Sequence, residues 1–193
     1  MTEITRTDRL TLRRFTRSDV DNLLGLYQDP EVMRYLDNED WSADRVATEI
    51  IPELLADYRR YRHYGYWAAE TYDGAFVGRI GLHPVIMDPS PNGLWEHAPT
   101  DECGTVSIGY RLRRRYWGRG LATEAATAMV AMAFDHLGVS HAVATTMAVN
   151  QGSRRVLERV GFRHTRTVHL EWDEPLPGAD QGEVVYERYR EQS

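Results

Sequence analysis

VSIGYRLRRRYWGRGLATEA, residues 106–125, is the stretch that decides the fold of this chain of 193 residues. Its first part alternates the apolar residues Val106, Ile108 and Tyr110 with others, which predicts a β-strand. Arginines follow, then two glycines one residue apart, and then a run that favours a long helix. Backbone amides at the start of a helix favour an anion, because they are unpaired and the helix dipole is positive there. The stretch therefore predicts a phosphate site between a strand and a helix.

The composition is that of a globular protein with one core. Hydrophobic residues make up 42% of the chain and charged residues 27%, which is ordinary, so we expect residues 1–193 to form a single domain. Cys103 is the only cysteine, which excludes an internal disulfide and a thiolate metal site. We interpret it as a plain small residue, with an acyl-cysteine intermediate as the alternative. The histidines form no H-E-x-x-H pair, so no metal is expected.

Net charge and hydropathy limit the partners. The net charge is −6 and the pI is near 5.6, which argues against nucleic acid. No apolar run approaches the roughly 20 residues that a membrane helix needs, and the first ten residues lack the apolar segment of a signal peptide. We therefore expect no nucleic-acid partner, no membrane partner and a cytoplasmic location.

All 23 basic residues are arginines. The absence of lysine excludes a Schiff base and the lysine-bearing phosphate loop. A cluster of these arginines lies in the opening stretch, at Arg111, Arg113, Arg114, Arg115 and Arg119. We interpret the cluster as part of the anion site, with a solvated arginine-rich turn as the alternative.

The first half of the chain predicts a strand, two helices and a hairpin. DRLTLRRF, residues 8–15, alternates like a strand, and Ser18 with Asp21 resembles a capping box for a helix that ends near residue 29. Ser42 begins a longer helix that Pro52 is expected to kink or divide. Residues 65–82 predict a hairpin about an Asp-Gly turn. The proline-rich residues 83–102 are expected to form a functional or mobile loop.

The second half alternates strands and helices. It predicts strands at 105–112 and 141–149, a helix from Leu121 that Gly138 ends, a helix at 153–160 that Gly161 ends, and closing strands at 163–172 and 182–190. A strand, helix, strand order implies a right-handed crossover and parallel strands. Antiparallel elements on either side make the fold class mixed α/β.

The glycines match one phosphate motif better than the others. A dinucleotide fingerprint needs a third glycine where Thr123 stands, and an acid near His141, where none is present. The G-x-S-x-G pattern of hydrolases is one residue off around Ser107, which lies in the middle of a predicted strand. What fits is R-x-x-G-x-G, formed by Arg115, Gly118 and Gly120.

This motif resembles the acyl-coenzyme A loop of the GNAT superfamily of N-acetyltransferases. IGYRLRRRYWGRGLATEA, AFDHLGV and NQGSRRVLERVGF, together with TDRLTLRRFTRSD and DPEVMRYL, are similar to the RimJ/RimL branch, which acetylates protein N-termini. The resemblance covers about residues 8–189. It implies a GNAT fold, a central twisted mixed sheet flanked by helices and splayed between the parallel strands at 105–111 and 142–149. The pantetheine arm of acetyl-CoA would lie in that splay, and a homodimer is a further expectation.

The resemblance and the loop chemistry together predict the donor site. Glycines let the backbone approach the pyrophosphate, and arginines bind phosphate oxygens. The predicted cofactor-binding residues are Ile108, Gly109, Tyr110, Arg115, Trp117, Gly118, Arg119, Gly120, Leu121, Ala122, Asn150 and Ser153. Two have structural alternatives: Trp117 as a residue that shapes the loop, and Asn150 as the N-cap of the next helix.

Acyl transfer to an amine needs an oxyanion donor, a base and a proton for the leaving thiolate. The backbone N–H groups at 108–110 are the predicted oxyanion donors. Many relatives use a tyrosine as the acid where this chain has Leu157, so Ser153 is the candidate thiolate donor. Glu102 is the candidate base, with Glu96 behind it, and solvated loop acids are the alternative interpretation of both.

Two arginine-free segments carry acids that predict a cationic acceptor. These acids are Asp88, Glu96, Asp101, Glu102, Glu171, Asp173, Glu174, Asp180 and Glu183. Trp95 and Trp172 would add apolar or cation–π walls, while the arginines at 111–119 are expected on the opposite, cofactor side. The acceptor would be a basic peptide N-terminus or a small polyamine-like or aminoglycoside-like amine. The alternative is that the acids are solvated.

The leading function is therefore acetyl-CoA-dependent N-acetylation of a primary amine by direct attack. Two other classes stay open. A coenzyme A-binding sensor or partner module would keep the loop without turnover, and a nucleotide-binding protein would use the loop for another phosphate.

Overall fold

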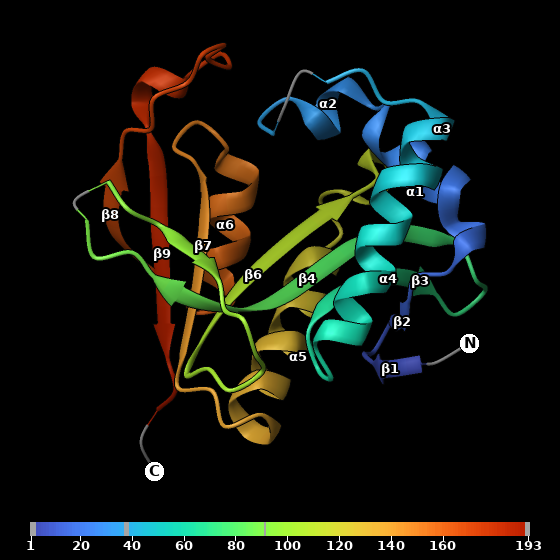
Figure 1. Cartoon of the computed structure of the whole chain (residues 1–193), viewed down its shortest axis with the longest axis horizontal. Helices are drawn as coiled ribbons and strands as arrows, with labels where there is room; N and C mark the ends of the chain where they lie inside the picture. Colours follow the sequence, from blue (N-terminus) through green and yellow to red (C-terminus); the bar gives the residue numbers. More distant parts are fainter. Residues whose placement is uncertain (1–2, 37–38, 91, 192–193) are drawn as a thin grey trace.

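The computed structural model describes residues 3–36, 39–90 and 92–191 and has a mixed α/β fold (Figure 1). Within these residues the strands are β1 (Glu3–Arg6), β2 (Leu10–Arg14), β3 (Gly65–Thr71), β4 (Phe76–Met87), β5 (Trp95–His97), β6 (Thr105–Leu112), β7 (His141–Met147), β8 (Arg163–Val168) and β9 (Glu183–Tyr189). The helices are α1 (Val20–Tyr27), α2 (Pro30–Met33), α3 (Ala43–Arg45), α4 (Ile51–Arg60), α5 (Leu121–His136) and α6 (Gln151–Arg159).

The strands form one open sheet in the order β1-β2-β3-β4-β6-β7-β9-β8, with β5 paired to β4. Every recorded pair is antiparallel except β6 with β7, which is parallel as predicted. That parallel ladder is short and joins residues 105–107 to residues 141–143. Beyond Ser107 no pairing between the two strands is recorded among the described residues, so the sheet is splayed where the sequence predicted.

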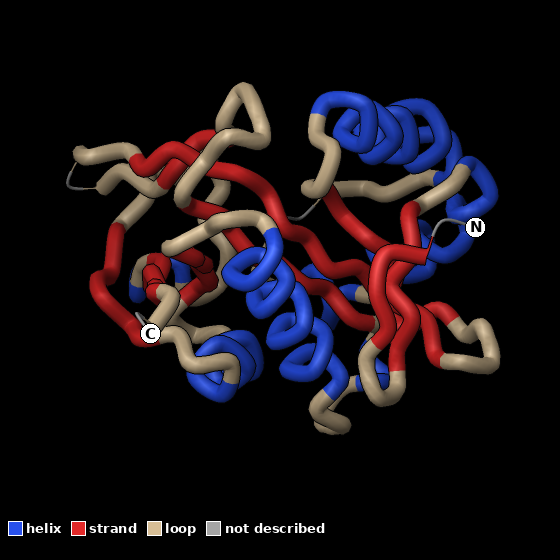
Figure 2. Tube along the Cα trace, turned by 90° about the horizontal axis from the view of Figure 1, so that it is seen from below, coloured by secondary structure: helices blue, strands red, loops and turns tan. Residues whose placement is uncertain are grey.

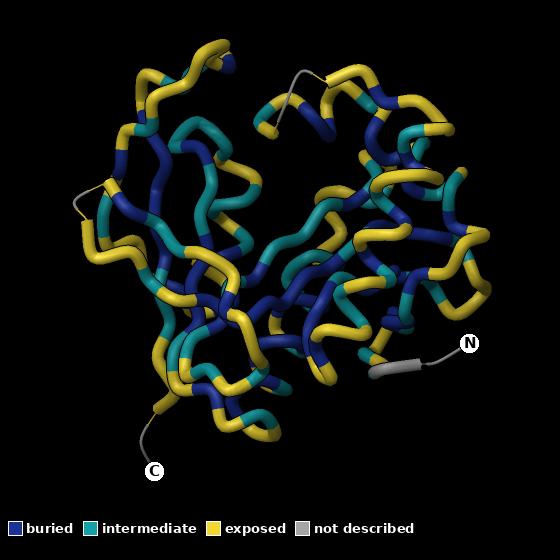
Figure 3. Tube along the Cα trace, viewed as in Figure 1, coloured by how far each residue is buried: buried dark blue, intermediate teal, exposed yellow. Residues whose placement is uncertain are grey.

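Helices cover both faces of the sheet (Figure 2). On one face, which we call the α5 face, α5 and α6 pack against the buried side chains of Ile108 and Leu112. On the other, the α1 face, α1 and α4 enclose a second core with Phe15 and Phe76. The buried segments follow the strands, while the turns are exposed (Figure 3).

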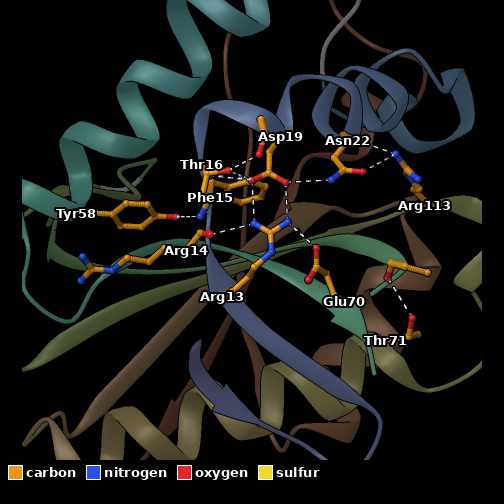
Figure 4. A network of polar contacts seen from close by, with 12 residues as sticks. Arg13, Arg14, Phe15, Thr16, Asp19, Asn22, Tyr58, Glu70, Thr71 and Arg113 are labelled. Atoms are coloured by element: carbon orange, nitrogen blue, oxygen red, sulfur yellow. Dashed lines mark hydrogen bonds and ion pairs between the residues drawn. The ribbon is translucent and has the colours of Figure 1, made fainter. Parts of the chain in front are cut away.

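The cap of the first helix differs from the prediction. Asp19 accepts a hydrogen bond from the Thr16 backbone N–H at 2.8 Å, so the capping box is Thr16 with Asp19 and not Ser18 with Asp21. The physical reason is that Asp19 also pairs with Arg13, whose Nη2 lies 2.7 Å from Oδ1 (Figure 4). This ion pair is buried and holds the start of α1 against β2.

The helix that Ser42 begins is divided as predicted. The Ser42 hydroxyl accepts a hydrogen bond from the Arg45 backbone N–H at 3.1 Å. A π-helical turn, Val46–Ile50, separates α3 from α4, and Pro52 lies in the first turn of α4. Proline has no backbone N–H to donate to the preceding turn, and in the first turn of a helix none is required. The wider π-helical turn before it leaves room for the proline ring.

The segment at 83–102 is not the loop that the sequence predicted. β4 continues to Met87 and pairs with β5, with Val85 opposite His97 and Met87 opposite Trp95. Pro84 lies within the strand, opposite Val106. Three-residue strands carry too little periodicity to be detected from sequence. Pro91 lies outside the described residues.

The remaining elements match the predictions closely. The hairpin at 65–82 is β3 and β4, and α5 and α6 end near Gly138 (φ +70°) and Gly161 (φ +91°). β8 ends at Val168, four residues before the predicted end. No helix in the described part of the chain is long and apolar enough to span a bilayer. Residues 3–36, 39–90 and 92–191 also contain no cluster of three metal-ligating side chains.

Candidate active site

The loop between β6 and α5 presents backbone amides for which the described part of the chain records no acceptor. Gly118 (φ +71°) and Gly120 (φ +77°) both have left-handed backbones, which glycine adopts at low cost. A side chain at Gly118 would meet nothing within 4 Å, so the loop is open on this side. No acceptor is recorded in the described residues for the N–H groups of 118–122. This arrangement can bind an anion at the start of α5.

Two anchors hold the loop in place. The Trp117 indole Nε1 donates to the Leu112 backbone oxygen at 2.7 Å, a contact that joins the loop to the end of β6. Arg9 Nη1 donates to the Arg119 backbone oxygen at 2.8 Å, and Arg9 Nε donates to Glu124 at 2.6 Å. The sequence analysis missed Arg9 and Glu124, because no local pattern links residues more than 100 positions apart.

The Glu124 carboxylate lies in the first turn of α5 and accepts hydrogen bonds from Thr7 and Arg9. Burial alone would raise the pKa of Glu124, but hydrogen bonds from Thr7 and Arg9 outweigh burial and lower it. The Thr7 hydroxyl lies 2.5 Å from Oε1, and the Arg9 backbone N–H lies 2.8 Å from the same atom. The start of β2 is therefore tied to the anion loop.

Only part of the arginine cluster surrounds this loop. Arg114, Arg115 and Arg119 are exposed there. Arg113 instead donates from Nη2 to the Asn22 backbone oxygen at 3.2 Å (Figure 4), and Arg111 contacts the Met33 sulfur at 3.3 Å. The expectation that all the arginines at 111–119 lie on the cofactor side is wrong for these two.

The reason is strand geometry. Alternate side chains of a strand point to opposite faces, so Arg111 points to the α1 face while Tyr110 and Leu112 pack on the α5 face. Arg113, two residues after Arg111, also lies on the α1 face and donates a hydrogen bond to Asn22 of α1.

The predicted donor residues on β6 and α5 offer mainly backbone. The side chains of Ile108 and Leu121 are both 5% exposed and lie in the core, so only their main chains can contact a ligand. Gly109 has open space where a side chain would stand, and Ala122 is half-buried at the second position of α5. The edge of β6 that faces β7 is unpaired from residue 108 onward.

Tyr110 and Ser153 meet across the splay between β6 and α6. The Tyr110 hydroxyl donates to the Ser153 backbone oxygen at 2.9 Å and lies 3.0 Å from the Ser153 Oγ. Burial raises the pKa of the Tyr110 phenol well above its ordinary value, so it stays protonated. The sequence analysis named Tyr110 only for its backbone and did not predict this contact.

Asn150 is the N-cap of α6. Its side-chain oxygen accepts a hydrogen bond from the Ser153 backbone N–H at 3.1 Å, as the structural alternative predicted. The cap uses the amide oxygen and leaves the amide N–H₂ group available. Leu157, at the position where many relatives have a tyrosine, is 1% exposed and belongs to the core.

The two candidate bases lie at the surface. Glu102 is exposed in the loop before β6. Glu96 is exposed on β5 opposite Ile86, so it points away from the face on which His97 and Val85 lie. Neither carboxylate has a hydrogen bond or ion pair recorded within residues 39–90 and 92–191. The structure does not bring them into one cluster, and their roles stay predictions.

A stacked imidazole pair on the α1 face, in which His83 is buried and His97 is exposed, was not predicted. The rings of His83 and His97 are stacked with centroids 4.8 Å apart, and His83 Nε2 lies 3.4 Å from the Asp57 carboxylate. Burial, with the neighbouring His83, lowers the pKa of His97. His83 is opposite Ser107 of β6, so this cluster borders the site.

The predicted acidic residues are mostly solvent-facing. Asp88, Glu96, Glu102, Glu171, Asp173, Glu174 and Asp180 are exposed. Asp101 accepts a hydrogen bond from the Arg62 backbone N–H at 2.8 Å. Glu183 differs from the others, because it is buried beside Thr145 and burial raises its pKa.

Comparison with known proteins agrees with this geometry. A family model described as an acetyltransferase (GNAT) domain matches residues 9–163, which is more than half of the chain. The chain belongs to the GNAT acetyltransferase family. A relative from Aspergillus fumigatus, the FsC-acetyl coenzyme A-N(2)-transacetylase, is 32% identical over 167 residues, which are 86% of this chain and 68% of that protein. The chain is therefore an acetyltransferase.

Solved GNAT acetyltransferases share the fold. RimL, a ribosomal-protein alpha-N-acetyltransferase in complex with coenzyme A, superposes with a TM-score of 0.73 at 18% identity over 97% of this chain and 98% of that one. The aminoglycoside acetyltransferase AAC(6')-Ib in complex with coenzyme A gives 0.69 at 20% identity over 94% and 95%. The predicted fold class, an open splayed mixed sheet, is confirmed.

Proposed function

We propose that this GNAT acetyltransferase transfers the acetyl group of acetyl-CoA to the nitrogen of a primary amine. The observation that carries the proposal is the run of unpaired amides at 118–122 at one end of an unpaired strand edge. Two relatives in the same family support it, since the solved RimL and AAC(6')-Ib structures are coenzyme A complexes. The sequences of the loop and of α6 are similar to the RimJ/RimL branch. This similarity supports the amine at a protein N-terminus as one candidate acceptor.

The residues present fit acetyl-CoA. The amides at 118–122 would bind the pyrophosphate, and Arg115 and Arg119 would bind its outer oxygens and the 3′-phosphate. The guanidinium carbons of Arg115 and Arg119 lie 5.0 and 5.8 Å from the centroid of the Tyr116 ring. Both positive charges are therefore at the loop. The unpaired edge at 108–110 offers N–H and C=O groups to the pantetheine amides, as a neighbouring strand would.

The chain's own groups would serve three tasks in acyl transfer. Acetyl-CoA supplies the thioester carbonyl and a thiolate leaving group. Backbone N–H groups at 108–110 would stabilise the oxyanion that forms as the amine attacks. The Ser153 Oγ–H would donate to the thiolate sulfur, and the Tyr110 hydroxyl 3.0 Å away holds that Oγ in position. The Tyr110 hydroxyl donates its hydrogen bond to the Ser153 backbone oxygen. It therefore does not need the Ser153 Oγ as an acceptor.

The base is proposed to be Glu102, with Glu96 as second choice. Glu102 precedes β6 and is exposed, so it can take a proton from an incoming ammonium and release it to water. Glu102→Gln should flatten the acid limb of the pH profile of kcat/KM. An unchanged profile would move the role to Glu96 or to water.

The acceptor is proposed to enter as a cation. Exposed acids precede β9, and this segment lies at the same end of the molecule as α2, whereas the acids directly before β6 lie at the opposite end of β7 and β9 (Figure 1). An acidic entrance attracts an ammonium group and loses this effect as salt rises. A salt titration of kcat/KM tests it, because an efficiency indifferent to salt contradicts electrostatic attraction.

The decisive experiment mixes the purified chain with acetyl-CoA and a panel of primary amines. Thiol release together with an acetylated amine, detected by mass spectrometry, is the expected result. Binding of acetyl-CoA without thiol release for any amine would favour a sensor module. Stabilisation by ATP or NAD in preference to acetyl-CoA would favour a nucleotide-binding protein.

A further inference from the structure

Glu183 is a buried acid that no cation of the described residues compensates. The residue is 9% exposed, and the ion pairs recorded within residues 3–36, 39–90 and 92–191 include none with it. Its one recorded hydrogen bond comes from the Thr145 hydroxyl to Oε2 at 3.2 Å. Burial of an ionised carboxylate costs free energy unless an opposite charge or several donors replace the lost water. A bound cation would therefore stabilise this group.

One oxygen of the Glu183 carboxylate is open to a ligand. Oε2 accepts from Thr145, whereas no partner of Oε1 is recorded in the described part of the chain. Oε1 is also not among the buried side-chain atoms that lack a partner there, so it keeps some contact with solvent. A small cation can therefore reach Oε1 while Thr145 holds Oε2 in place.

The carboxylate lies on the α1 face, at the level of the splay. Counting on from the pair of Ser107 with Val143, Gly109 and Thr145 stand at the same level of the two diverging strands, and alternation puts both on the α1 face. Glu183 belongs to β9, and its contact with Thr145 places the carboxylate over β7, on the side toward β6. Figure 1 shows β7 and β9 side by side and β6 diverging from them.

The α1 face is open at this level of β6. A side chain at Gly109 would meet nothing within 4 Å. The anion loop leads into α5, which covers the opposite face of the sheet. If the donor reaches the splay from the anion loop, the acceptor has the α1 face for its approach, where Glu183 lies.

The spacing of the strands separates the carboxylate from β6. Paired strands are about 4.8 Å apart, and β6 and β7 are no longer paired at the level of Gly109, so their separation is larger there. The Glu183 carboxylate lies over β7. It is therefore roughly one strand spacing or more from a carbonyl held at 108–110, and a chain of a few carbon atoms spans this space.

An ammonium group that Glu183 binds would stay charged. A carboxylate in contact with an amine stabilises the protonated form of that amine, whereas the amine that attacks a thioester must be neutral. The group that suits Glu183 is therefore a second ammonium of the acceptor, while the reacting nitrogen lies nearer to Gly109.

We infer that the acceptor of this enzyme is a short diamine, of which one nitrogen is acetylated at β6 while Glu183 binds the other as an ammonium group. The inference rests on the proposed function and deepens it, because it names the class of acceptor and the residue that selects it. An ammonium supplies the positive charge that the buried carboxylate lacks and an N–H donor for Oε1. Thr145 is the positioning residue, since it holds the other oxygen.

The experiment compares acceptors that differ only at the far end. The probes are putrescine, 4-amino-1-butanol and butylamine, which carry an ammonium, a hydroxyl or no polar group at the end of the same carbon chain. We expect kcat/KM for putrescine to exceed that for 4-amino-1-butanol by at least about tenfold, the value of one charged hydrogen bond. Glu183→Gln should reduce this ratio about tenfold to a hundredfold, through KM for putrescine, and leave the amino alcohol unchanged.

Two further variants make the result specific. Glu183→Asp keeps the charge on a shorter side chain, so it should recover part of the ratio, and it keeps the test valid if the glutamine variant does not fold. Asp180→Asn is the matched control, because it removes one negative charge from an exposed residue of the turn Ala179–Gln181, directly before β9. This variant should keep the wild-type ratio.

Three outcomes overturn the inference. In the first, the wild type acetylates putrescine no better than 4-amino-1-butanol. In the second, Glu183→Gln lowers kcat for all three amines alike, which would assign Glu183 to the reacting nitrogen. In the third, Asp180→Asn lowers the ratio as much as Glu183→Gln, which would make the preference a general effect of charge. Failure of the proposed function is a different result, namely no acetyl-CoA binding by the wild type.

Discussion

The two edges of β6 differ in how far they are paired. On the β4 side the ladder runs over Gly78–Pro84 and Val106–Leu112, and the two β4 glycines in it, Gly78 and Gly81, are tightly enclosed. On the β7 side it stops at Ser107. A backbone polar group removed from water must be paired, so the closed edge is scaffold and the open edge is available to a ligand. One strand thus serves both as core and as binding surface.

Beyond the closed edge of β6, the sheet also contains a buried arginine that pairs with two carboxylates. Arg13 pairs with Asp19 and with Glu70, whose Oε1 lies 2.5 Å from Nη2 (Figure 4). Near the open edge, by contrast, Arg115 and Arg119 are exposed and the amides at 118–122 are unpaired. We therefore expect substitutions on the closed side to change stability, and substitutions on the open side to change ligand binding or turnover.

The largest effect is expected from Asp19→Ala on the closed side. Removing one member leaves Arg13 buried with only Glu70, which should lower the free energy of unfolding by about 3–5 kcal/mol in urea titration. Burial acts to raise the pKa of Asp19, but hydrogen bonds from Arg13, Asn22 and Thr16 outweigh it and lower the pKa. The stability from this shift is present above the unfolded pKa of about 3.9 and is lost as the pH falls through the folded value. The variant should lack that acid dependence.

Gly120→Val should have the next largest effect, and on binding. A branched side chain at φ +77° would cover the amides that are proposed to bind the pyrophosphate, so acetyl-CoA affinity should fall about a thousandfold, or about 4 kcal/mol. Gly138→Val is the matched control, because Gly138 has φ +70° and open space but lies at the far end of α5. Equal affinity in the wild type and Gly120→Val, measured by calorimetry, would refute the phosphate assignment.

A pair of glycine substitutions compares the two sides of the strand pair directly. A side chain at Gly78 would stand 2.2 Å from the Arg111 backbone oxygen, so Gly78→Ala should cost about 3 kcal/mol by forcing β4 from β6. Gly109→Ala meets open space and should change stability by no more than about 1 kcal/mol. Thermal unfolding of both variants checks this. Similar melting temperatures would mean that the two positions are equally packed.

Arg115→Ala should weaken acetyl-CoA binding less than Gly120→Val. One charged hydrogen bond is lost while the backbone amides remain, which corresponds to about 1.5–3 kcal/mol. Arg59→Ala is a charge control, since Arg59 is exposed on α4. If both variants bind acetyl-CoA like the wild type, the arginine is not a phosphate ligand.

Ser153→Ala should have the smallest effect and the most selective one. Turnover should fall about tenfold while acetyl-CoA affinity is unchanged, because donation to the thiolate matters only in the transition state. Tyr110→Phe should reproduce the loss if its hydroxyl positions the serine. Ser140→Ala, an exposed serine near Gly104, is the control. An equal loss of affinity and turnover in Ser153→Ala would instead make the serine a binding residue.

Local patterns predicted more of the fold than of the site. The glycines that end α5 and α6 and the Asn150 cap depend on residues within a few positions of each other, and the parallel crossover depends on the order strand, helix, strand; all of them are present. The first capping box was misassigned because Thr16 and Ser18 both precede an aspartate by three residues. The ion pair of Asp19 with Arg13 decides between them, and that contact joins a helix to a strand.

What the sequence by itself determined is the glycine loop between β6 and α5 and the strands and helices on either side of it, because glycine conformation, helix capping and alternation are short-range effects. What only the tertiary structure decided is which groups meet from distant parts of the chain. The Tyr110 hydroxyl reaches Ser153 across 43 positions, and Arg79 is brought opposite Arg111 by strand register. Alternation along β6 would have predicted that Arg111 lies on the opposite face from Tyr110. It could not have predicted that α2, with Met33, covers that face. Contacts of this kind depend on how sheet and helices pack, and no local pattern encodes them.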